Sequence, residues 1–370
     1  MEKFEVIIKR LQAEKLILLM GAPGTGKTRI LNQIAEIFEN GQVSAAPPVY
    51  DPSASVPIPA SPMATTLGVL PMLQRQNRKV FRMTLHQNSH YRDFVSGIVP
   101  KTDGTSGFRV SKGKLYEANE FAKSPDSSAL LIIDEINRGP VIEVFGASIA
   151  AIEADKRLDE NNVPLPTTCS FSILNPNPGP ENIDYQLSPH LYILAAMNQA
   201  DVSVAPIDIA FLRRWGRVPL TPDYSVLLKC LGVPDGTAIP DQEDHNTVSL
   251  YAMAAKALET INNKIIAGRG DAYQLGHGIL LSKNPVPNTY DDACEYLLKC
   301  WHSIYGHIEE LFFGDVSSIA FMVNADQVGS PYKTAIRSFA GTSRTVLLEP
   351  KLTKDEVFLL YKSLTIMPQE

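Results

Sequence analysis

Cysteine is scarce in this 370-residue chain, and the four that are present do not pair at short spacing. Cys169, Cys230, Cys294 and Cys300 form no Cys-x2-Cys motif, which excludes a zinc ribbon or a disulfide framework as the basis of the fold. Only Cys294 and Cys300 lie near each other, and their spacing does not place both on one helical face. We therefore expect buried thiols in a reducing, intracellular compartment.

Long apolar runs are also absent. No stretch approaches the ~18 apolar residues that a membrane-spanning helix needs. The first residues, MEKFEVIIKRLQ, lack the apolar core of a secretory signal. These absences exclude an integral membrane protein and predict a cytoplasmic location with no membrane partner.

Neither sign of charge predominates, because 34 basic residues face 40 acidic ones and the net charge is −6. A chain-wide cationic surface is excluded, so any contact with nucleic acid is local or made through a partner. What is present is a globular composition, with 44% hydrophobic and 20% charged residues. At roughly 150 residues per domain, the length predicts two packed units, or one α/β core with a large appendage.

Apolar runs alternate with helical periodicity in the first part of the chain. Strands are predicted at residues 16–20, 79–85, 129–133 and 191–196, and a hairpin at 97–114. Helical spacing of apolar residues predicts a helix after the glycine-rich turn at 21–26 and another over 141–157. This order predicts an α/β fold with a parallel, doubly wound sheet flanked by helices.

After residue 222 the sequence pattern predicts mainly helices. We expect a nucleotide-binding core over 1–222, with a Pro-, Ala- and Ser-rich insertion at about 41–73, and a helical lid over 223–316. The lid has predicted helices at 248–267 and 291–304 and a short one near Glu309. The extension at 317–370 contains strand-like pieces, such as 344–348, and stays unassigned.

A glycine-rich motif follows the first predicted strand directly. It fits G-x4-G-K-[ST], lies between a strand and a helix, and is therefore a P-loop, the loop that binds nucleotide phosphates. Lys27 reaches the β- and γ-phosphates, and the hydroxyl of Thr28 is a ligand of Mg²⁺. The predicted nucleotide-binding residues are Gly21, Ala22, Pro23, Gly24, Thr25, Gly26, Lys27, Thr28 and Arg29.

Two adjacent carboxylates, Asp134 and Glu135, end the strand at 129–133. Successive side chains at a strand tip point in opposite directions. One carboxylate can therefore hold the metal ion while the other faces a water beside the γ-phosphate. We assign Asp134 to Mg²⁺ and Glu135 to the general base.

Polar residues also follow the strand at 191–196. Asn198 is predicted to orient the attacking water, and Arg213 and Arg214 are candidates for an arginine that reaches the γ-phosphate of a neighbouring subunit. A solvated or salt-bridged arginine pair is the alternative. His86 and His90 are expected to be structural, and Arg269 is either a lid arginine that senses phosphate or a loop arginine.

These motifs, in this order, resemble an AAA+ ATPase module. The resemblance narrows to McrB, the NTPase subunit of modification-dependent restriction systems, and covers about residues 15–316 without the two Pro-rich excursions. The matching segments are residues 81–100, 134–139, 152–157, 261–265, 274–278 and 308–315.

The resemblance implies a hexameric ring that hydrolyses ATP or GTP with Mg²⁺ and acts on DNA through partners, among them a McrC-like nuclease subunit. Two features of this sequence depart from the family pattern. The family signature MNTADRS reads Met197-Asn-Gln-Ala-Asp-Val-Ser here, so the choice between GTP and ATP is undecided, and no DNA-reading domain is expected ahead of the motor.

Two other functions fit the same motifs. A remodelling ATPase of the MoxR or dynein type, acting on protein complexes, would use the same core residues. A nucleotide-gated scaffold that assembles without hydrolysis is the second, and Glu135 argues against it because a scaffold needs no general base.

Overall fold

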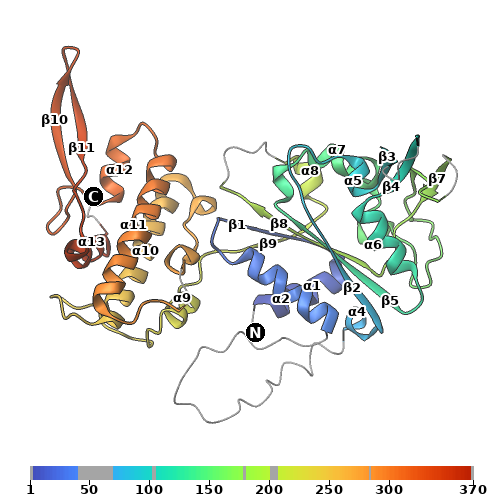
Figure 1. The fold of residues 1–370 in the computed structure, drawn as a ribbon, viewed down its shortest axis with the longest axis horizontal. Helices are drawn as coiled ribbons and strands as arrows, with labels where there is room; N and C mark the ends of the chain where they lie inside the picture. The colour runs from blue at the N-terminus through green and yellow to red at the C-terminus, as the bar shows by residue number, and fades with distance from the viewer. Residues whose placement is uncertain are drawn as a thin grey trace, which may run out of the picture. The chain divides into compact units, whose positions relative to one another are not determined.

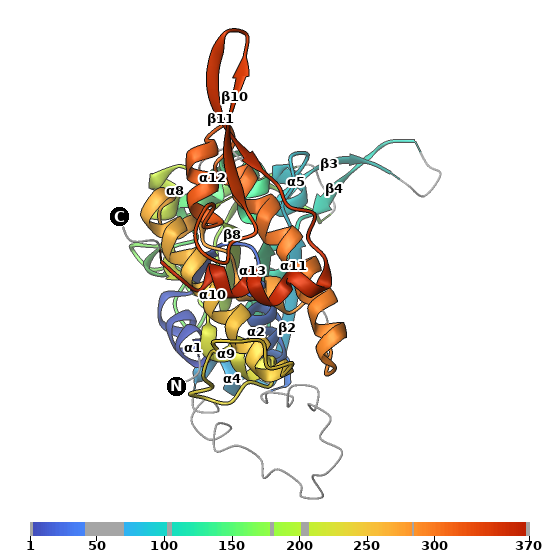
Figure 2. The same ribbon diagram turned by 90° about the vertical axis from the view of Figure 1, so that its left-hand side faces the viewer.

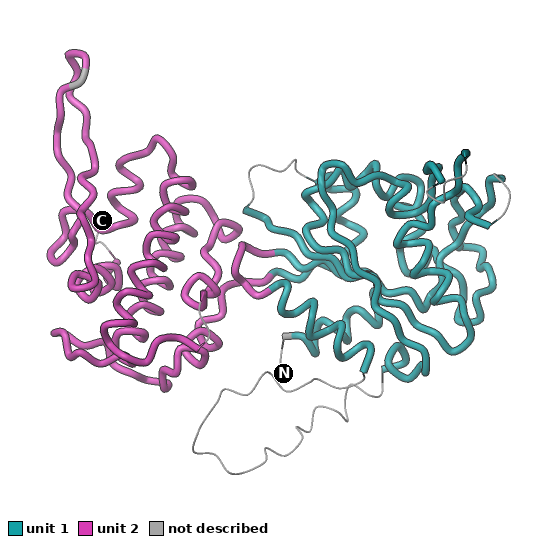
Figure 3. Tube along the Cα trace, viewed as in Figure 1, with its two compact units in different colours: residues 1–20, 27–219 teal, residues 21–26, 220–370 magenta. Residues whose placement is uncertain are grey.

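The computed structural model describes residues 3–40, 70–101, 106–177, 181–200, 207–282 and 285–367. The chain forms two compact units (Figure 3). The first comprises residues 1–20 and 27–219, and the second comprises residues 21–26 and 220–370. The short glycine-rich loop at 21–26 therefore packs with the second unit, although the residues on both sides of it belong to the first.

A five-stranded sheet forms the centre of the first unit, and its strand order is β2-β5-β8-β1-β9. Its parallel pairs include β2 with β5, β5 with β8 and β1 with β9. The expected parallel sheet is confirmed. The strands are β1 (Leu16–Gly21), β2 (Asn77–Thr84), β5 (Ser127–Asp134), β8 (Leu191–Asn198) and β9 (Gly216–Pro219).

Helices cover both faces of this sheet, with α1 and α2 on one side and α6 and α7 on the other (Figure 1). Nearly every residue of β5 and β8 is buried, as expected of central strands covered on both faces. The α-helices are α1 (Lys3–Glu14), α2 (Lys27–Asn40), α4 (Pro71–Gln74), α5 (Tyr91–Phe94), α6 (Lys114–Lys123), α7 (Val141–Phe145) and α8 (Ile209–Leu212). Two small hairpins complete the unit, β3 (Ser96–Pro100) with β4 (Phe108–Lys112) and β6 (Phe171–Leu174) with β7 (Asn182–Tyr185).

The helix predicted over 141–157 is wrong beyond its first turns. Helix α7 ends at Phe145, because Gly146 adopts a positive φ of 50° and its N–H donates to the carbonyl of Ile142. Short 3-10 turns follow at Gly146–Ala150 and Ala154–Lys156. The carbonyl of Ile152, which a continued helix would use, accepts instead from the Arg157 side chain at 3.0 and 2.7 Å.

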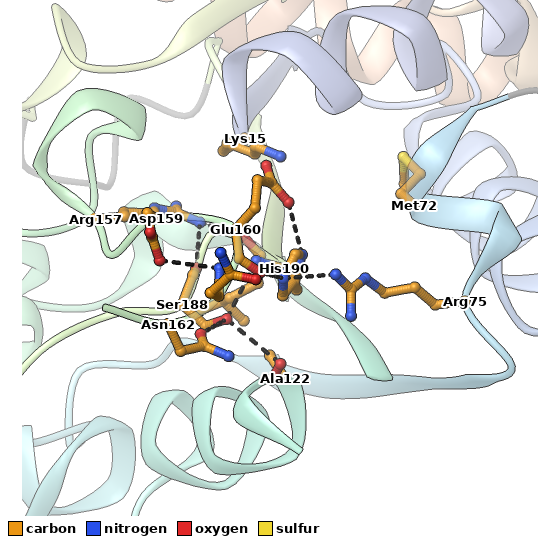
Figure 4. A network of polar contacts seen from close by, with 12 residues as sticks. Lys15, Met72, Arg75, Ala122, Arg157, Asp159, Glu160, Asn162, Ser188 and His190 are labelled. Atoms are coloured by element: carbon orange, nitrogen blue, oxygen red, sulfur yellow. Dashed lines mark hydrogen bonds and ion pairs between the residues drawn. The ribbon is translucent and has the colours of Figure 1, made fainter. Parts of the chain in front are cut away.

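Arg157 is the centre of a polar network at the edge of the sheet where β5 and β8 begin (Figure 4). Its guanidinium is fully buried and also donates to the carbonyl of Leu191. Burial lowers the pKa of Arg157 to about 10. Nearby, an Arg75 nitrogen lies 2.7 Å from His190 Nε2, and the Lys15 ammonium donates to the Tyr192 hydroxyl at 3.1 Å. The network ties the segment after the 3-10 turns to the sheet.

The second unit is mainly helical. Its long helices α10 (Thr247–Arg269) and α11 (Tyr290–Leu311) pack with α9 (Tyr224–Cys230), α12 (Val316–Met322) and α13 (Val357–Leu364) around one apolar core. The expected lid helices are present, and the predicted short helix near Glu309 is instead the last turn of α11. Cys294 and Cys300 are buried on α11, as expected.

The C-terminal extension joins this core. Tyr361 of α13 donates to the carbonyl of Leu297 at 2.9 Å, and Trp301 donates to the hydroxyl of Tyr332 at 2.9 Å. Between α12 and α13 the chain forms a hairpin of β10 (Lys333–Phe339) and β11 (Thr342–Leu348). The remaining 3-10 turns are Ile136–Arg138, Asp271–Tyr273, His277–Leu280 and Lys354–Glu356.

Some predictions fall outside the described residues. These are most of the insertion at 41–73, since 41–69 are not described, and the Asp201 to Ser203 part of the altered signature. Within the described part of the chain, no helix is both long enough and apolar enough to cross a bilayer.

Candidate nucleotide site

The glycine-rich loop connects the end of β1 to the start of α2. Gly24 and Gly26 have φ values of 77° and 87°, which only glycine adopts without strain. The Thr25 hydroxyl closes the turn by donating to the carbonyl of Ala22 at 2.9 Å. Because the loop ends where α2 begins at Lys27, its backbone N–H groups lie at a helix N-terminus, which favours phosphate.

Backbone hydrogen bonds from residues 276 and 278, in the second unit, hold this loop. The N–H of Gly276 donates to the carbonyl of Pro23 at 3.1 Å, and the N–H of Gly278 donates to that of Gly24 at 2.9 Å. A Cβ at position 276 would lie 2.1 Å from the carbonyl carbon of Gly24. Only glycine, which has no Cβ, allows the two backbones to come this close. Sequence reasoning noted residues 274–278 as part of the resemblance but missed this contact.

A buried asparagine of α10 supports the same segment. Asn262 donates from Nδ2 to the carbonyl of Leu275 at 2.9 Å and accepts from the Leu275 N–H at 2.7 Å. The amide nitrogen and the amide oxygen of Asn262 therefore both bond the backbone of Leu275. Since Asn262 is almost fully buried, the backbone just before Gly276 is firmly positioned.

In the first unit, Lys27 begins α2, and only 8% of the residue is exposed. Burial lowers the pKa of Lys27 to about 8, against the opposing effect of Glu135 and Asp134. The two carboxylates therefore lie near enough to Lys27 to favour its charged form. A phosphate placed here would favour the charged ammonium.

Asp134 and Glu135 stand at the carboxyl end of β5. Glu135 has a φ of 50°, a left-handed conformation that is uncommon for a residue with a side chain. Its N–H donates to Asp134 Oδ1 at 3.0 Å. Strained backbone of this kind concentrates at functional sites, because the surrounding structure must hold it in place.

Both carboxylate oxygens of Glu135 have partners. Asn198, at the end of β8, donates from Nδ2 to Oε1 at 2.7 Å, and Arg138 pairs with Oε2 at 3.1 Å. Asn137 in turn donates to the carbonyl of Asn198 at 2.9 Å. Asn198, which was predicted to orient the attacking water, thus contacts Glu135, the predicted general base, and both roles stay predictions. Asn137 and Arg138 were not singled out for a role, although they directly follow the two acids.

Two buried amide oxygens at this point have no partner within the described residues, Oδ1 of Asn198 and Oδ1 of Asn137. Buried acceptors without donors are costly unless water or a ligand satisfies them. The Nδ2 atom of Asn198 bonds the Glu135 carboxylate and that of Asn137 bonds the Asn198 backbone, so both acceptors belong to the polar cluster around Glu135.

The residues also fit a magnesium nucleotide. Mg²⁺ prefers oxygen ligands and takes one or two from protein when phosphates supply others. The Thr28 hydroxyl, on an exposed residue, and the half-buried Asp134 carboxylate are such ligands. Arg29, the next residue of α2, is exposed and makes no contact that assigns it a role.

The two candidate arginines at the end of α8 differ in their surroundings. The Arg214 Nε pairs with Glu153 Oε1 at 2.8 Å, and its guanidinium also donates to the carbonyl of Ala210. Arg213 is exposed to solvent. Of the two, Arg213 is therefore the one free to reach a neighbouring molecule.

The other singled-out residues have local contacts. His86 Nδ1 accepts from the Asn88 N–H at 3.2 Å, and His90 forms a capping box with Asp93 at the start of α5. Arg269 ends α10 and lies over the ring of Phe312, 5.1 Å from its centre. It belongs to a helix rather than to a loop.

The chain is similar in sequence to known proteins. Residues 66–215 match the model of the AAA domain, dynein-related subfamily. The methyl-directed type IV restriction enzyme EcoKMcrB subunit of Escherichia coli is 30% identical over 60% of this chain and 38% of its own length. The type II restriction enzyme BsuMI component YdiS of Bacillus subtilis is 27% identical over 54% of each chain. The chain thus spans about half or less of these curated relatives.

Solved structures match at low similarity. PCH-2 of C. elegans aligns with a TM-score of 0.33 and 13% identity, covering 81% of this chain and 67% of that one. NtrX of Brucella abortus aligns with a TM-score of 0.31 and 12% identity, covering 86% of this chain and 63% of that one.

Proposed function

We propose that this chain, an AAA+ NTPase related to the McrB subunit of a restriction enzyme, is the motor of an McrBC-like complex. Such a motor hydrolyses GTP or ATP and moves DNA for a partner nuclease. The observation that carries the hydrolytic part is the hydrogen bond of Asn198 to Glu135, formed beside the buried ammonium of Lys27.

Phosphate binding follows from the loop and the helix after it. The N–H groups of the loop at 21–26 and the ammonium of Lys27 hold the β- and γ-phosphates. Thr28 and Asp134 would hold Mg²⁺, which neutralises charge on the phosphate oxygens. Because Lys27 is largely buried, water screens its attraction for phosphate less than it would that of an exposed lysine.

Glu135 acts as the general base on the attacking water. Asn198 fixes one oxygen of its carboxylate, and the free amide oxygens of Asn198 and Asn137 orient the water. The ion pair with Arg138 holds the second carboxylate oxygen, and the remaining lone pairs of the carboxylate can accept the proton of the water. Arg138 is a positioning residue in this scheme.

Charge that develops on the transferred phosphoryl group needs a further cation. Arg213, exposed at the end of α8, supplies it to the site of a neighbouring subunit, as arginine fingers do. This role requires a homo-oligomer, and a hexameric ring is our proposal. Arg214 instead stabilises its own subunit through Glu153.

The action on DNA is proposed from the two relatives, both named as components of restriction enzymes. A McrC-like nuclease would be the partner that hydrolysis drives. The matched model, named for a dynein-related subfamily, favours one alternative, a remodelling ATPase that acts on protein complexes. DNA-stimulated turnover would support the first, and turnover indifferent to DNA would support the second.

The first test is steady-state hydrolysis of GTP and ATP, side by side, with particle size measured under each nucleotide. We expect turnover with at least one nucleotide and assembly in its presence, and Glu135→Gln should bind nucleotide without hydrolysing it. If the wild type and Glu135→Gln hydrolyse nucleotide at the same slow rate, the proposed enzymatic function is refuted and a nucleotide-gated scaffold remains.

A further inference from the structure

A two-stranded ribbon projects from the helices of the second unit (Figures 1 and 2). Strands β10 and β11 pair over seven positions, from Lys333 with Leu348 to Phe339 with Thr342. Ala340 and Gly341 close it with φ values of 47° and 76°, the pattern of a tight type I′ hairpin turn. At ~3.4 Å per residue the ribbon is about 24 Å long.

The ribbon is basic in an acidic chain. Residues 333–348 contain Lys333, Arg337 and Arg344 and no acidic residue, whereas the whole chain carries a net charge of −6. All three cations are exposed. All the charged side chains of this projecting element are therefore positive.

The register places these cations on a single face. Side chains alternate between faces along a strand, and directly paired residues share a face. Arg337 pairs directly with Arg344, and Lys333 lies four residues from Arg337 on the same strand. The three exposed cations of the ribbon therefore share one face.

The opposite face anchors the base of the ribbon. The Thr334 hydroxyl donates to Asp326 Oδ2 at 2.5 Å, and its N–H donates to Asp326 Oδ1 at 3.1 Å. Leu347 packs against the apolar core of the second unit. The anchored end is the base, so the Arg337–Arg344 pair lies toward the free end.

We propose that this basic ribbon binds the phosphates of double-stranded DNA. The major groove of B-form DNA admits a two-stranded ribbon, whereas the deep, narrow major groove of A-form RNA does not. Three exposed cations on one face complement the negative charge of a phosphate backbone. The proposal rests on the proposed DNA-directed function but assigns it a contact on this chain.

The test measures binding of a fluorescent DNA duplex of arbitrary sequence by anisotropy, over a range of salt, with and without Mg²⁺ and nucleotide. The ribbon variant is Arg337→Gln with Arg344→Gln. The matched control is Lys229→Gln with Lys299→Gln, which removes two exposed cations from α9 and α11 of the same unit. Hydrolysis without DNA is measured in parallel for all three proteins.

We expect the ribbon variant to bind the duplex at least about tenfold more weakly, with a salt dependence shallower by about 1.8 in log–log slope. The control keeps the wild-type affinity, and basal hydrolysis is unchanged in both. Replacing both arginines by lysine should restore most of the affinity, because a phosphate contact needs charge more than shape.

Equal losses in the ribbon variant and the control would overturn the proposal, as would a wild type that binds no duplex in any nucleotide state. Displacement of the duplex by polyglutamate at equal charge would also overturn it, and would point to an acidic protein surface instead. In each case basal hydrolysis still reports separately on the proposed NTPase.

Discussion

Asn198 Nδ2 lies 2.7 Å from Glu135 Oε1, joining the ends of two adjacent strands, β8 and β5. The sheet brings the two residues together, because parallel neighbours present their carboxyl ends at the same edge. The hydrogen bond fixes the orientation of the proposed base and leaves the amide oxygen of Asn198 for water.

Asn198→Ala removes this donor. We expect kcat to fall about 100-fold, with nucleotide affinity changed by less than about threefold, because the interaction is used in the transition state rather than in binding. Single-turnover hydrolysis and binding of a fluorescent nucleotide measure the two effects. Asn161→Ala, at an exposed asparagine outside the site, is the control. An affinity loss as large as the loss of kcat would contradict the assignment.

Gly276→Ala tests the support of the phosphate loop. The added Cβ would lie 2.1 Å from the Gly24 carbonyl carbon, so one of the two backbones must move. We expect nucleotide affinity to fall at least about tenfold, because the loop no longer presents its N–H groups correctly. Titration calorimetry with nucleotide measures this.

Gly306→Ala is the control for that change, because a Cβ there meets nothing within 4 Å. Alanine within α11 should leave affinity unchanged and raise helix stability slightly. If both variants bind nucleotide like the wild type, the contact of Gly276 with the loop has no role in binding.

Arg213→Ala should lower turnover about 1,000-fold while assembly persists, since an arginine finger acts only on the transition state. Arg214→Ala should instead lower the unfolding temperature, because it leaves Glu153 without its ion pair. Glu153→Gln should reproduce the Arg214 effect. A turnover loss in Arg214→Ala that Glu153→Gln does not share would identify Arg214 as the finger.

Lys15 gives a pH dependence to stability. Burial and the neighbouring Arg157 lower the pKa of Lys15 to about 8 in the folded protein. The unfolded chain, with an ordinary lysine pKa near 10.4, binds more protons between about pH 8 and 10. Stability supplied by this site therefore rises with pH across that window.

Lys15→Met removes this dependence. We expect the unfolding temperature of the variant to exceed that of the wild type at pH 7 and the two to converge toward pH 10. Other buried lysines, such as Lys264, contribute equally to both proteins and cancel in the difference. Parallel curves from pH 7 to 10 would show that Lys15 is not the source.

The central sheet could be predicted because its strands carry their own signals. Residues 129–133 and 191–196 are continuous apolar runs that end in polar residues, and the P-loop is a complete local motif. Those local patterns also located Lys27, Asp134, Glu135 and Asn198, whose roles stay proposals.

What could not be predicted depends on partners distant in the sequence. The end of α7 depends on Gly146 and on the hydrogen bond that the Arg157 side chain donates to the Ile152 carbonyl. The hairpin was visible only at 344–348, because β10 mixes charged and apolar residues and its Ala-Gly turn is a weak signal.

The hydrogen bond from Gly276 to Pro23 joins residues about 250 positions apart. During synthesis, at about 5–20 residues per second, the loop at 21–26 therefore emerges from the ribosome well before its supporting segment exists. Over that interval the nascent chain has a phosphate-binding sequence with its supporting contacts unmade. The contact that Gly276→Ala tests can therefore act on nucleotide affinity only after residues 276–278 have been made.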